Sequence, residues 1–192
     1  MTLNYNADRT IISECHHNDN KLMIQCVSIK TPVTALHWYH GYLLVGSGGV
    51  VRVLQYDDPY NFYKQVAQFQ VLTSSTVRGL KSFWDRYNDP RAPMMKNADE
   101  RQLILVYGGK DIALVSSRED VFTIFHNFKF SDWIHDVQPL KNNCLAVALA
   151  HNSVVLYNWS TSSVCKQVHC DNKCILYSAT FTTDRRFTIT SK

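Results

Sequence analysis

Apolar residues in this chain occur in short runs that come in pairs, and small or polar residues separate the two runs of each pair. The pattern appears three times, with runs at 42–45 and 50–56, at 103–107 and 112–115, and at 145–149 and 154–157. The separating segments are Gly46-Ser47-Gly48-Gly49, Gly108-Gly109-Lys110-Asp111 and Ala150-His151-Asn152-Ser153. Short apolar runs joined by such turns predict β-hairpins.

The spacing of these hairpins indicates a repeat. The turns begin at residues 46, 108 and 150, which are 62 and 42 residues apart. The second separation lies within the range of about 40 to 45 residues of WD repeats. The first is longer, and its surplus falls in residues 82–101, which are rich in Pro, Asp, Asn and Arg. We expect an inserted surface loop there, because loop-closure entropy grows only slowly with loop length.

Further strand-like runs flank each hairpin and would complete four-stranded antiparallel blades. They lie upstream at 33–36, 76–80 and 133–137, and downstream at 64–71, 121–130 and 164–169, where outer strands of alternating character are expected. Two further strand-like runs, at 174–181 and 186–190, would begin a fourth blade. No segment keeps an apolar period near 3.6, so helical repeats are not expected.

These features predict an all-β fold, an incomplete WD-repeat β-propeller of about three blades plus the start of a fourth. Residues 1–31 would form an N-terminal tail or an outer strand, and residues 32–192 the partial propeller. The alternative is a β-sandwich or barrel with repeated hairpins. The 42-residue spacing between the second and third hairpin turns argues against it. Since propellers close with about four to eight blades, we expect an N-terminal fragment that aggregates or folds poorly when expressed alone.

Composition excludes several classes of protein. With 45% apolar residues among 192, the chain has the composition of a folded protein. No apolar stretch approaches the roughly 18 residues of a membrane span, and no secretory signal is recognisable, so we expect a cytoplasmic protein with free thiols. A pI near 8.7 permits contact with nucleic acid but falls below the value of about 9 that marks a basic footprint.

Candidate sites for chemistry are few. The Gly46–Gly49 segment precedes a strand and not a helix, so a hairpin turn fits better than a phosphate loop. Cys165, His169, Cys170 and Cys174 cluster, as do Cys15-His16-His17, but neither group contains a Cys-x-x-Cys pair, and we predict no metal site.

His151 and Asp136 are the nearest to a general acid–base pair, and we interpret them as a structural contact between blade ends. Residues 81–101 mix basic and aromatic side chains that could touch RNA, but their net charge of +1 favours a solvated loop. We therefore predict no catalytic residue and no cofactor.

The stretch from Ser131-Asp132-Trp133 through Asp136-Val137, continued at 145–157, resembles the N-terminal propeller of the WD repeat-containing protein 6 family. Weaker similarity extends over residues 32–180. The resemblance marks seven residues as a signature with structural or interface roles: Ser131, Asp132, Trp133, Asp136, His151, Asn152 and Ser153.

The resemblance implies a cytoplasmic partner of a tRNA ribose 2′-O-methyltransferase that promotes methylation of the wobble nucleotide of the anticodon. In such a complex the partner enzyme would hold S-adenosylmethionine, and this chain would meet tRNA through the complex, without a membrane or a small-molecule substrate. The Trp-Asp dipeptide that ends a typical WD blade is replaced by Gln55-Tyr56, Ser116-Ser117 and Asn158-Trp159, which leaves blade boundaries open. The alternative is a general protein-interaction platform in another cytoplasmic complex, because fold does not fix function.

Overall fold

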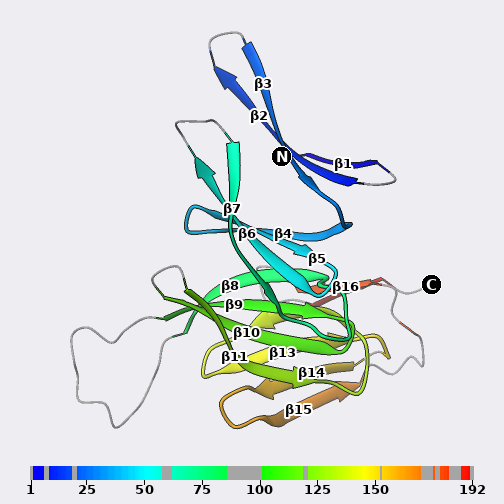
Figure 1. Cartoon of the computed structure of the whole chain (residues 1–192). Coiled ribbons are helices and arrows are strands. Elements are labelled where there is room, and N and C mark those ends of the chain that lie inside the picture. The colour runs from blue at the N-terminus through cyan, green and yellow to red at the C-terminus, as the bar shows by residue number, and fades with distance from the viewer. Residues whose placement is uncertain are drawn as a thin grey trace. The chain divides into compact units, whose positions relative to one another are not determined.

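The structure is a computed structural model, and it describes residues 2–6, 9–18, 21–57, 62–85, 101–118, 121–151, 153–169, 175, 178–181 and 187–190 (Figure 1). Every regular element in these residues is a β-strand, and the chain divides into two compact units, Met1–Leu80 and Lys81–Lys192. No helix long and apolar enough to cross a membrane occurs among the described residues.

The first unit contains two antiparallel sheets. Strands β1 (Thr2–Asn6), β2 (Arg9–Asn18) and β3 (Lys21–Ile29) form a three-stranded sheet. Strands β4 (Val33–Tyr39), β5 (Tyr42–Ser47), β6 (Val50–Asp57) and β7 (Phe62–Gln70) form a four-stranded sheet in chain order. Residues 1–31, expected to be a tail or an outer strand, thus contain three paired strands.

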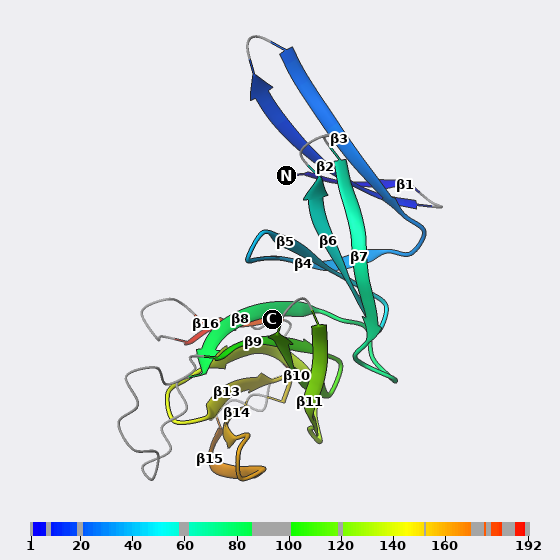
Figure 2. The same ribbon diagram turned by 60° about the vertical axis from the view of Figure 1, so that its left-hand side comes forward.

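The second unit repeats the four-stranded arrangement twice (Figure 2). Strands β8 (Gly79–Asp85), which starts at the unit boundary, β9 (Arg101–Gly108), β10 (Asp111–Arg118) and β11 (Val121–Lys129) form one sheet. Strands β12 (Ile134–Pro139), β13 (Cys144–Leu149), β14 (Ser153–Asn158) and β15 (Ser163–His169) form the next. Strands β16 (Ser178–Phe181) and β17 (Phe187–Thr190) pair as a hairpin, and β16 lies beside β12.

In the four-stranded sheets, burial falls from the middle strands to the outer strand. The middle strands carry the continuous apolar runs seen in the sequence, and Leu103–Val106 of β9 is fully buried because both of its faces are covered. One core joins the two large sheets of the second unit, built from residues such as Leu105, Leu114, Val147 and Trp159. Strand β15, by contrast, is exposed along its whole length.

The hairpin turns are tied by backbone hydrogen bonds to the segments that follow them in each unit. Gly48 O accepts a hydrogen bond from Val77 N at 2.7 Å, and in the second unit Gly109 O accepts one from Ile134 N at the same distance. Gly48 and Gly109 have φ values of +57° and +56°, which favour glycine. Gly49 has no room for a side chain, because a Cβ there would lie 1.9 Å from Leu72 O.

The predicted fold class is confirmed, since the described residues form an all-β structure with three four-stranded antiparallel sheets, each with its strands in chain order, which is consistent with an incomplete WD β-propeller. The Gly46–Gly49 segment closes the β5–β6 hairpin, as expected of a turn. Two details were wrong. Strand β8 extends to Asp85, inside the expected loop, because Phe83 packs on the core. Strand β15 is exposed at every residue, whereas buried and exposed residues were expected to alternate along it. Residues 86–100 of the expected loop lie outside the described residues.

Candidate interaction site

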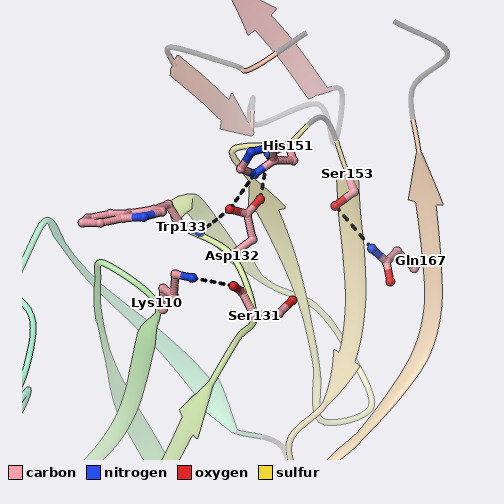
Figure 3. Close-up of polar contacts among 7 residues, drawn as sticks. All are labelled: Lys110, Ser131, Asp132, Trp133, His151, Ser153 and Gln167. Atoms are coloured by element: carbon pink, nitrogen blue, oxygen red, sulfur yellow. Dashed lines mark hydrogen bonds and ion pairs between the residues drawn. The ribbon is translucent and has the colours of Figure 1, made fainter. Parts of the chain in front are cut away.

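Asp132 lies in the loop between β11 and β12, and its carboxylate holds this loop to the β13–β14 turn (Figure 3). Oδ1 accepts a hydrogen bond from Trp133 N at 2.7 Å, and Oδ2 accepts one from His151 N at 2.7 Å. His151 Nδ1 lies 2.8 Å from Oδ1, and Ala150 N donates to Trp133 O at 2.8 Å. The start of β12 is therefore fixed to the turn by backbone and side-chain contacts together.

The protonation of Asp132 follows from these contacts. Burial raises the pKa of Asp132, but the hydrogen bonds from His151 and Trp133, together with the nearby imidazole, lower it further than burial raises it. The net pKa lies below the ordinary value for an aspartate, so the carboxylate is charged at neutral pH and attracts the N–H groups around it.

A tryptophan and a lysine flank the contacts between Asp132 and the β13–β14 turn, which we call the clamp. The Ser131 carbonyl accepts a hydrogen bond from Lys110 Nζ at 2.6 Å, which brings the β9–β10 turn of one sheet to the loop that opens the next. Trp133 is 51% exposed, and its indole projects away from the Asp132–His151 pair (Figure 3). His151 is also exposed, with 68% of its side-chain surface accessible. This end of the second unit thus exposes an indole and an imidazole.

Asp136 plays a different part, inside the second unit. It is buried, and its Oδ1 accepts hydrogen bonds from Lys81 Nζ at 2.7 Å, Tyr107 Oη at 2.8 Å and Val137 N at 2.8 Å. Burial, followed by the Asp136 charge and its hydrogen bond, raises the pKa of Tyr107 far above its ordinary value, so the phenol stays protonated and donates. These contacts join β8 and β9 of one sheet to β12 of the next.

The expected pairing of His151 with Asp136 is wrong. His151 pairs with Asp132, and Asp136 pairs with Lys81. The reason is position along the strand. Asp136 lies within β12 opposite Ala148, and its side chain reaches the neighbouring sheet, whereas Asp132 precedes the strand and lies at the same end as the β13–β14 turn.

The remaining signature residue in the described part is Ser153, at the start of β14. It is buried, and its Oγ accepts a hydrogen bond from Gln167 Nε2 of β15 at 3.4 Å, so it supports the pairing of the outer strand (Figure 3). Asn152 lies outside the described residues. Its contribution to the signature therefore stays a prediction.

The two cysteine clusters fall largely outside the described side chains. Cys165 and His169 lie on exposed β15, whereas Cys170 and Cys174 lie outside the described residues, and Cys15-His16-His17 belong to β2, whose side chains are not described. Within the side chains that are described, no three histidine, cysteine or carboxylate groups gather as metal ligands would.

A histidine paired with a carboxylate also occurs in hydrolase triads, which need a nucleophile on the second ring nitrogen. In the described part of the chain no hydroxyl or thiol is hydrogen-bonded to the His151 imidazole, whose ring contact is with Asp132. Both Asp132 oxygens accept backbone N–H groups. The geometry is that of a clamp between loops.

Sequence reasoning missed Lys81, Tyr107 and Lys110 as members of these networks. In the sequence, Lys81 belongs to the mixed basic and aromatic segment 81–101, and Tyr107 ends the apolar run 103–107. Their partners lie far along the chain, since Lys81 and Asp136 are 55 residues apart. A tyrosine that ends an otherwise aliphatic buried run, followed by a lysine in the turn, is the signal that could have pointed to them.

The chain is similar to WD-repeat proteins over most of its length. It is 28% identical over 158 residues to the tRNA (34-2′-O)-methyltransferase regulator WDR6 of Homo sapiens, and 28% identical over 156 residues to that of Mus musculus. Each match covers 79% of this chain. These matches support a distant WD-repeat relationship, in agreement with the three four-stranded sheets.

The matched proteins are much longer than this chain, which spans 13% of the length of the human and mouse relatives. The Bos taurus regulator of the same name matches at 28% identity over 156 residues. No protein-family model matches the chain. The relatives are named as regulators of a methyltransferase and not as the methyltransferase itself.

Proposed function

We propose that this chain is part of a non-catalytic regulatory subunit that binds a tRNA ribose 2′-O-methyltransferase and promotes methylation of the wobble nucleotide of the anticodon. The observation that carries the proposal is the similarity over 79% of the chain to proteins named as regulators of tRNA 34-2′-O methylation. The relatives are named as regulators of a tRNA (34-2′-O)-methyltransferase, and this name supports the proposal.

The structural contacts agree with a scaffold. Asp132, His151, Asp136 and Ser153 are engaged in hydrogen bonds that hold loops and strands in register. Rigid sheets with polar turns gathered at one end suit a surface that positions an enzyme, since binding residues are often carried by loops on a rigid scaffold. In the proposal the methyltransferase supplies S-adenosylmethionine and the reaction, and both proteins work in the cytoplasm.

Reconstitution tests the proposal. The protein that contains this chain is co-expressed with candidate tRNA ribose 2′-O-methyltransferases of the same cell, purified through a tag on the chain, and assayed with tRNA and labelled S-adenosylmethionine. We expect one methyltransferase to co-purify, and methyl transfer to the wobble ribose to rise when the subunit is present.

The alternative, a platform for another complex, predicts a different result. Partners unrelated to tRNA modification would co-purify, and the wobble methylation rate would be the same with and without the subunit. Val164→Ala, on the exposed outer strand β15, is a control for the assay. Since Val164 is 56% exposed and the substitution leaves the described hydrogen bonds intact, this variant should capture the methyltransferase as the unmodified subunit does.

A further inference from the structure

We draw no further inference here: the strongest candidate, the surface patch formed by the exposed side chains of Val164 and Val168 on the outer strand β15, carries none because nothing in the described part of the chain shows what covers it.

Discussion

Nζ of Lys81 lies 2.7 Å from Oδ1 of Asp136, and this ion pair joins two neighbouring sheets of the second unit. Asp136 is 5% exposed, so its charge depends on protein groups for stabilisation. Removing one partner of a buried pair leaves the other charge uncompensated, which costs more than the pair contributes when intact.

Asp136→Ala is therefore expected to destabilise the second unit strongly, by about 3 kcal/mol or more, because both Lys81 and Tyr107 lose their acceptor. Tyr107→Phe, which removes a single donor, should cost about 1 kcal/mol. Urea unfolding of the protein that contains this chain measures both losses. A double-mutant cycle with Lys81→Met should show that the two substitutions are not additive. Equal and small losses for all variants would contradict the network.

A second prediction concerns the clamp. Asp132→Ala removes the acceptor of two backbone N–H groups, so we expect a loss of about 1 to 3 kcal/mol in stability. His151→Ala is the matched control, because it keeps the His151 backbone N–H bonded to Asp132 and removes only the ring contact. It should cost clearly less. A greater loss for His151→Ala would mean that the imidazole, and not the backbone, holds the turn.

The clamp also predicts a pH dependence. The pKa of Asp132 is lower in the folded chain than in the unfolded one, so its contribution to stability is fully present above the unfolded value of about 3.9. It is lost as the pH falls through the folded pKa. Melting temperatures measured from pH 6 to pH 3 should fall less for Asp132→Asn than for the unmodified chain over the acidic end of that range. Parallel curves would contradict the prediction.

Two adjacent glycines of the β5–β6 turn should respond differently to substitution. A Cβ on Gly49 would lie 1.9 Å from Leu72 O, so Gly49→Ala forces the backbone apart. A Cβ on Gly48 meets nothing within 4 Å, and Gly48→Ala suffers only from its φ of +57°, a cost of about 1 to 2 kcal/mol. We expect Gly49→Ala to lower the melting temperature more, and the reverse order would contradict the described turn.

The strands could be predicted from the sequence because one middle strand of each four-stranded sheet, β5, β9 or β13, is buried on both faces and has an uninterrupted apolar sequence, as in Leu103–Val106. The side-chain network could not be predicted. Asp132 and Asp136 are equally polar and only four positions apart in the sequence, yet one lies before β12 and the other within it. Only the register of β12 against β13, with its shift between Ile134 and Asp136, decides which carboxylate meets His151.

The burial of the outer strands could not be predicted either, because it depends on which other elements cover them. Strand β15 contains Val164 and Val168, which suggest an alternating buried face, but no further element covers that face among the described residues, and both side chains are exposed. Trp133 is part of the signature, and the sequence does not indicate that its backbone N–H donates to Asp132 or that its side chain is 51% exposed.

The most direct test of the central claim is the ribose methylation of the wobble nucleotide of tRNA, measured by mass spectrometry in cells that lack the protein containing this chain. We predict that methylation at that position falls sharply and returns when the unmodified protein is restored, while other ribose methylations made by unrelated enzymes stay constant. Unchanged wobble methylation in cells without the protein would contradict the account.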